Sequence, residues 1–272
     1  MGESSVRHPA VAGQFYPREQ SRLMAEVQSY LHVEGEPVSA FGCVAPHAGY
    51  VYSGRVAGAV YAHVAIPQRC IVLCPNHTGY GTPLSMMAAG VWETPLGDVP
   101  IDSALAGSLL KAFPLLREDS DAHRGEHAIE VQLPFLVSRR ADLRFVPIAI
   151  GTRGYEALNG LGKAIARVLS ETGDPVLVVA SSDMNHYESD AVTRVKDRKA
   201  IEKILALDPA GLNEVVTQDH VSMCGYGPTI AMLTAAKEMG ATSAELVKYA
   251  TSGDVSGDRE MVVGYAGVVV PG

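Results

Sequence analysis

Three histidines of this chain, His47, His77 and His186, each lie a few residues beyond a short apolar segment. A single histidine in a loop is usually a surface residue. Three in the same structural position indicate a shared site, because binding and catalytic residues gather on loops that a rigid scaffold holds in place. Neutral imidazole is the commonest metal ligand in proteins. The pattern therefore predicts a pocket that can bind a metal ion.

Cys224 is the fourth residue of chemical interest. It lies shortly before a helix that we expect to begin at Pro228. A thiolate near the N-terminus of a helix is stabilised by the helix dipole, which favours metal ligation or nucleophilic attack. The alternative is a buried cysteine that packs as a small apolar residue. We adopt that interpretation for the remaining cysteines, Cys43, Cys70 and Cys74.

Asp183 and His186 are three residues apart, so a tight turn would place them on one side of the chain. A carboxylate next to an imidazole raises its basicity and fixes its tautomer. Such a pair is typical of a general acid or base, with His186 carrying the proton and Asp183 orienting the ring. The alternative is that Asp183 only caps a helix beginning at Met184.

The segment 123–127 matches H-x-x-E-H, a zinc-peptidase pattern, with His123, Glu126 and His127 as its members. That motif needs a helix along its whole length, and Gly125 weakens a helix there. We favour a different interpretation, in which Glu126 or His127 opens a helix over Ala128–Val137 whose start faces the pocket.

Alternating strands and helices would position these residues. Short β-branched segments bounded by Pro, Gly or Asn predict buried strands, and apolar residues at helical spacing predict the helices between them. The alternation predicts one α/β domain over residues 1–272, with a mixed, mostly parallel sheet flanked by helices. Ligands bind such sheets beyond the carboxyl ends of the strands. The predicted strands are Phe41–Ala45, Cys70–Cys74, Phe145–Ile150, Val176–Ala180 and Met261–Val270, and the predicted helices are Arg22–Leu31, Ser103–Ala112, Tyr155–Thr172, Val192–Leu205 and Pro228–Glu238.

The composition limits the class of protein. A net charge of −8 argues against a general binder of nucleic acid or anionic membranes, which needs a basic surface. The first residues lack the pattern of a signal peptide, and no apolar stretch approaches the ~20 residues that span a bilayer. Without a secretion signal the four cysteines are not expected to form disulfides. We expect a reduced, cytoplasmic protein.

Several segments together resemble the Memo family, and they run in order along almost the whole chain. The segments are Arg7–Tyr16, Ala45–Tyr50, Thr94–Asp98, Glu126–Glu130, Ser181–Asp183 with His186, and Cys224–Gly225. The blocks Pro-His-Ala-Gly-Tyr and Ser-Ser-Asp-x-x-His are the most specific of these.

The resemblance implies a fold similar to the class III extradiol dioxygenases, which are non-haem iron enzymes. It implies that His47, His77 and Cys224 bind Fe(II) or Cu(I), with Zn as a further candidate, beside Asp183 and His186. Extradiol dioxygenases use two histidines and a carboxylate, and here the softer Cys224 takes the place of the carboxylate. Prokaryotic members of the family tend to be encoded beside a radical-SAM protein, a possible partner, and eukaryotic members are named as mediators of cell motility.

Three functions remain open at this stage. The leading one is a redox-active iron or copper site that handles dioxygen, a reduced oxygen species or a small organic substrate. The second is a metal-dependent hydrolase, since a metal held by two histidines and a cysteine can activate water. The third is a non-catalytic protein that binds a metal for delivery or grips a peptide.

Overall fold

The computed structural model describes residues 5–32 and 35–272. Its centre is a mixed sheet whose four middle strands are parallel and lie in the order β2, β9, β3, β8. Antiparallel pairs flank them, because β12 pairs with β2 and β4 pairs with β8. The strands of this sheet are β2 (Ala40–Ala45), β3 (Arg69–Pro75), β4 (Leu84–Met86), β7 (Arg117–Glu118), β8 (Arg144–Ile150), β9 (Val176–Ser181), β10 (His186–Glu188), β11 (Glu245–Thr251) and β12 (Val262–Pro271).

The central strands are buried on both faces. In β3, Ile71 and Leu73 pack into one apolar cluster, while Cys70, Val72 and Cys74 pack into the other. Successive side chains of a strand point to opposite faces, so each strand supplies both clusters. Continuous apolar strands are therefore what this architecture requires.

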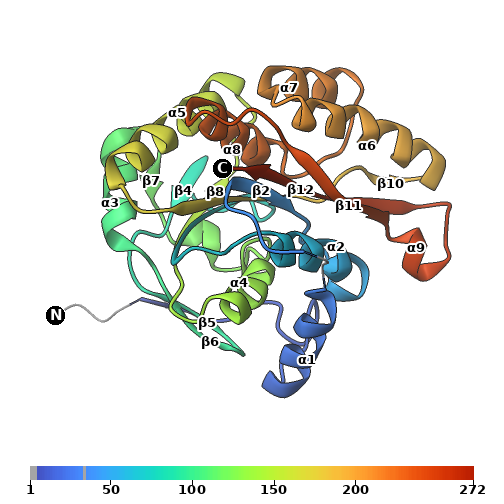
Figure 1. The fold of residues 1–272 in the computed structure, drawn as a ribbon, viewed down its shortest axis with the longest axis horizontal. Coiled ribbons are helices and arrows are strands. Elements are labelled where there is room, and N and C mark those ends of the chain that lie inside the picture. The colour runs from blue at the N-terminus through green and yellow to red at the C-terminus, as the bar shows by residue number, and fades with distance from the viewer. Residues whose placement is uncertain (1–4, 33–34) are drawn as a thin grey trace.

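Helices cover the two faces of the sheet, as Figure 1 shows. One face carries α3 (Ser103–Ala112), α5 (Tyr155–Thr172), α6 (Asp190–Leu205), α7 (Pro209–Gln218) and α8 (Tyr226–Glu238). The other carries α1 (Gln20–Tyr30), α2 (Tyr50–His63) and α4 (Leu133–Arg139), together with a small sheet of β1 (Val6–Arg7), β5 (Val91–Thr94) and β6 (Gly97–Pro100). Short turns of helix complete the described chain: η1 (Asp121–His123), η2 (Glu130–Gln132) and α9 (Gly253–Ser256).

The predicted fold class is confirmed, since the chain is an α/β domain with a mixed sheet flanked by helices. All five predicted strands and five predicted helices are present, with ends shifted by no more than two residues. The helix predicted over 128–137 is displaced, because η2 begins at Glu130 and the α-helix α4 only at Leu133.

Helix α2 was not predicted from the sequence. It follows His47 and is buried around almost its whole circumference, so it lacks the polar face that produces a helical period. Gly54 and Gly58 allow it to pack against Tyr30 of α1, since a Cβ atom at either glycine would lie 2.5 Å from the nearest atom of Tyr30.

Among the helices of residues 5–32 and 35–272, none is both long and apolar enough to cross a membrane.

Candidate metal centre

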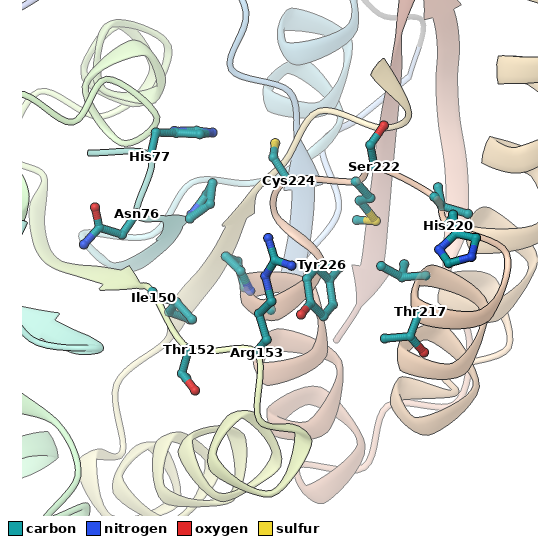
Figure 2. Close-up of a pocket in the computed structure, with 17 residues that line it drawn as sticks. Asn76, His77, Ile150, Thr152, Arg153, Thr217, His220, Ser222, Cys224 and Tyr226 are labelled. Carbon is teal, nitrogen blue, oxygen red and sulfur yellow. The ribbon is translucent and has the colours of Figure 1, made fainter. Parts of the chain in front are cut away.

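The carboxyl ends of β2, β9 and β3 bring distant residues together. His47 follows β2 and His77 follows β3, on either side of the central strand β9. The loop before α8 adds Cys224, which Figure 2 shows near His77. One ligand atom from each of His47, His77 and Cys224 lies within 4.8 Å of the other two. The structure thus places the three predicted ligands around a common point.

Hydrogen bonds fix the tautomer of His47, which is almost fully buried. Its Nδ1 lies 2.9 Å from Ser181 Oγ, and that hydroxyl donates its only proton to the carbonyl of Ala128 at 2.7 Å. Ser181 Oγ must therefore accept a hydrogen bond from the Nδ1–H of His47. The lone pair of Nε2 then points into the site, where Cys224 Sγ lies 3.2 Å away.

A carboxylate holds His77. Glu126 is fully buried; its Oε1 lies 2.9 Å from His77 Nδ1, and its Oε2 accepts from the His77 backbone N–H at 2.6 Å. Burial opposes protonation of His77, but the hydrogen bond and charge of Glu126 outweigh it and raise the pKa of the imidazole. Since Nδ1 donates to the carboxylate, Nε2 is again the atom left for a ligand.

The sulfur of Cys224 is held between His47 Nε2 and the carbonyl of Asp183, which lies 3.7 Å away. Burial and the nearby Asp183 carboxylate raise the pKa of the thiol well above its usual range. Burial thus favours the protonated thiol, contrary to the thiolate expected near a helix N-terminus, and a bound cation would favour the thiolate.

Gly225 lets the Cys224 loop approach the end of β9. A Cβ atom at this position would lie 2.3 Å from the carbonyl oxygen of Ser181 and 2.4 Å from the Cβ of Ser182. The Gly225 N–H also donates to Ser182 Oγ at 3.0 Å. Close contact of the Gly225 backbone with Ser181 and Ser182 therefore fixes how far Cys224 reaches into the site.

Asp183 and His186 both reach the pocket, but they do not pair as the sequence suggested. Asp183 Oδ1 accepts from the backbone N–H groups of His47, at 2.8 Å, and Ala48. His186 Nδ1 instead hydrogen-bonds the carbonyl of Ser222 at 2.9 Å. Burial raises the pKa of Asp183 to about 7, against the effect of these hydrogen bonds. Asp183 thus orients the His47 loop, and Ser222 orients His186.

Glu126 and His127 were predicted only to begin a helix whose start faces the pocket, whereas in the structure their side chains contact His77. The His127 ring stacks on His77, with centroids 4.8 Å apart, and meets His47 edge-on. No helix runs through residues 123–127, and the His123 ring packs against Trp92 instead. The zinc-peptidase pattern therefore has no structural basis, although its last two residues do belong to the site.

The donor set fits one metal ion. Bonds of about 2.0–2.3 Å at a tetrahedral centre place neighbouring N and S donors roughly 3.5 Å apart. The 3.2 Å between His47 Nε2 and Cys224 Sγ is close to that spacing. His77, Glu126 and His127 form a second group within 4.8 Å. Three hydrogen bonds from His77 and Ala128 already occupy the Glu126 carboxylate, so its role is to orient His77.

A cavity of about 500 Å³ opens over these groups. Asp183 and His186 line it, together with Phe15, His127 and Tyr187. The cavity is large enough for a small organic molecule.

Sequence comparison now adds to this geometry. The family model of the Memo-like proteins matches residues 7–269, nearly the full length. The chain belongs to the Memo family. A MEMO1 family protein of Methanosarcina barkeri is 46% identical, over 97% of this chain and 100% of its own length. One from Methanopyrus kandleri is 45% identical, over 97% of this chain and 98% of its own.

A solved structure supports the fold. The crystal structure of an uncharacterized protein from Escherichia coli K12 superposes with a TM-score of 0.52 over 84% of this chain and 98% of that protein. The two sequences are 15% identical, so this similarity concerns the fold alone.

Proposed function

We propose that this Memo-family protein binds one iron or copper ion through His47, His77 and Cys224. This ion would carry out redox chemistry on dioxygen, a reduced oxygen species or a small organic substrate. One observation carries it: the three donor atoms lie within 4.8 Å of one another at the edge of the sheet. The donor chemistry agrees, since two imidazoles and a thiolate suit iron and Cu(I) better than they suit hard cations.

Bound at this point, the ion would supply electron transfer and polarise a substrate atom. The protein's part is to hold the donors still. Ser181 accepts a hydrogen bond from the Nδ1–H of His47, and Glu126 accepts one from the Nδ1–H of His77. Neither ring can therefore turn away without losing a buried hydrogen bond. Asp183 holds the backbone of the His47 loop.

His186 is the proposed acid or base. Its Nδ1 is held by the Ser222 carbonyl, which leaves Nε2 free to take up or release a proton. The ring lines the same cavity as His47, His77 and Cys224, so it borders the space that a substrate would occupy.

Metal analysis of the anaerobically purified protein tests the proposal. We expect one equivalent of iron or copper in the wild type, and its loss in His47→Ala and Cys224→Ala. His63→Ala on α2 and Cys43→Ala in β2 are matched controls, because both residues lie outside the site, and they should retain the metal. Full metal content in both site variants would overturn the proposal.

The identity of the metal separates this function from its rivals. Redox-inactive zinc at full occupancy would support the hydrolase instead. Rapid transfer of the ion to a chelator, with no turnover of oxidase, dioxygenase or hydrolase substrates, would support a protein that only binds the metal.

A further inference from the structure

A second cavity, of about 700 Å³, lies against the other side of Cys224 and His77. Figure 2 shows it between the strand ends that carry Asn76 and Ile150 and the helices that carry Thr217 and Tyr226. His77, Ser222 and Cys224 line this cavity and also the one over the candidate metal centre. A molecule bound in the second cavity would therefore touch two of the three proposed ligands.

The lining of this cavity differs in charge from the rest of the protein. The chain has a net charge of −8, yet none of the 17 lining residues is Asp or Glu. Its ionisable side chains include Arg153, His77 and His220. A wall with one permanent cation and no carboxylate favours an anionic ligand.

Arg153 is available to bind that anion. It precedes α5 and is exposed, and Figure 2 shows its guanidinium group rising into the cavity beside Tyr226. Other arginines, such as Arg69 and Arg194, are paired with aspartates. Among the described residues, by contrast, no carboxylate lies within ion-pair distance of Arg153. A guanidinium group presents paired N–H donors that match a carboxylate or phosphate.

The first turn of α8 also lines the cavity. Its candidate donors are the backbone N–H groups of Tyr226 and Gly227, because Pro228 has no N–H, and the preceding Gly225 provides no side-chain cap. The first N–H groups of a helix have no partner within the helix, and the helix dipole favours an anion there. The unpaired Arg153 and this uncapped turn belong to two different segments that meet at one cavity.

The remaining wall is partly apolar. Ile150, Val216 and Met223 line it, beside polar residues such as Asn76 and Thr217. A bare inorganic ion would leave this surface in contact with water. An organic molecule with an acidic head group would cover it.

We propose that this cavity binds the carboxylate or phosphate group of a small organic anion, held by Arg153 and the first turn of α8. The organic part of the ligand then extends along Ile150 and Met223 to Cys224 and His77. That this ligand is a substrate rests on the proposed metal centre, whereas its binding does not.

Calorimetric titration of the metal-free protein with benzoate and with inorganic phosphate tests the binding. Without a metal, the anions cannot bind by coordination. We expect at least one of them to bind, and Arg153→Met to weaken it by about 10-fold or more. Arg139→Met, at the exposed end of α4 on the opposite face of the sheet, is the matched control and should bind as the wild type does. Preference for benzoate or phosphate identifies the head group.

A second variant guards against a structural effect of the first. Thr217→Glu places a carboxylate on the exposed wall of the cavity and should also weaken anion binding. Absence of binding to the wild type, or equal binding by wild type and Arg153→Met, would overturn the inference even if the metal is present. Anion binding in a protein that holds no metal when purified would instead overturn the proposed metal centre and leave this cavity assigned.

Discussion

The two histidines proposed as ligands, His47 and His77, are held by different means. His47 is almost fully buried, and a neutral hydroxyl, Ser181 Oγ, accepts its Nδ1–H. His77 is partly exposed, and the charged Glu126 accepts both its Nδ1–H and its backbone N–H. Both arrangements leave Nε2 facing the same point.

The two histidines differ in how many residues share the work of holding the ring. The neutral contact of His47 forms part of a network, since Ser181 Oγ also accepts from Gln132 Nε2 at 2.8 Å and donates to Ala128. The charged contact of His77 depends on a single carboxylate, but charge-assisted hydrogen bonds are roughly twice as strong as neutral ones. We therefore expect the His77 side to respond more strongly to the loss of one residue.

Removal of Glu126 should have the largest effect. In Glu126→Ala, three N–H groups of His77 and Ala128 lose their acceptor. We expect the free energy of unfolding of the metal-free protein to fall by about 3 kcal/mol, and metal affinity to fall by about 100-fold. Urea denaturation and competition with a chelator measure the two quantities. Glu118→Ala, in the exposed strand β7, is the control and should change neither.

Removal of the Ser181 hydroxyl should have an intermediate effect. Ser181→Ala leaves the Nδ1–H of His47 without its acceptor and also removes one partner of Gln132. We expect a loss of about 2 kcal/mol in stability and of about 10-fold in metal affinity. The same two measurements apply. If Ser181→Ala weakened metal binding more than Glu126→Ala, the ranking of the two sides would be wrong.

Tyr61→Phe should have the smallest effect. The Tyr61 hydroxyl donates to Gln132 Oε1 at 2.8 Å, so Tyr61 is linked to His47 only through Gln132 and Ser181. We expect a loss of about 1 kcal/mol in stability and no measurable change in metal affinity, because Ser181 still accepts from His47. A large loss of metal would show that the network acts as one unit.

The elements that carry the site were largely predictable from the sequence. Strands β2, β3 and β9 are continuous apolar segments with polar residues directly after them, so their ends could be found and the meeting of His47 with His77 expected. Helix α2 could not be predicted from periodicity, because it is apolar on nearly every side. The late start of α4 was also unpredicted, because residues 126–129 are used for contacts within the site instead of for a helix.

Pairing of side chains was less predictable than their position. The spacing of Asp183 and His186 suggested a hydrogen bond between them. Asp183 instead accepts from the backbone N–H of His47, which lies 136 residues earlier in the chain. Glu126 had a local interpretation as a helix start, and only the folded chain brings it to His77. Nothing near Arg153 in the sequence indicated a cavity, because its walls come from three distant stretches of the chain, within 75–77, 150–153 and 216–228.

The crowding around Gly225 has a consequence for altering this centre. Because the Gly225 backbone packs against the residues at the end of β9, the main chain at residue 224 has a fixed position, whichever side chain it carries. Replacing Cys224 by another ligand residue should therefore change the donor atom while the backbone of the loop keeps its position. A methyl group added at the next residue, as in Gly225→Ala, should instead displace the loop and any donor at position 224 with it.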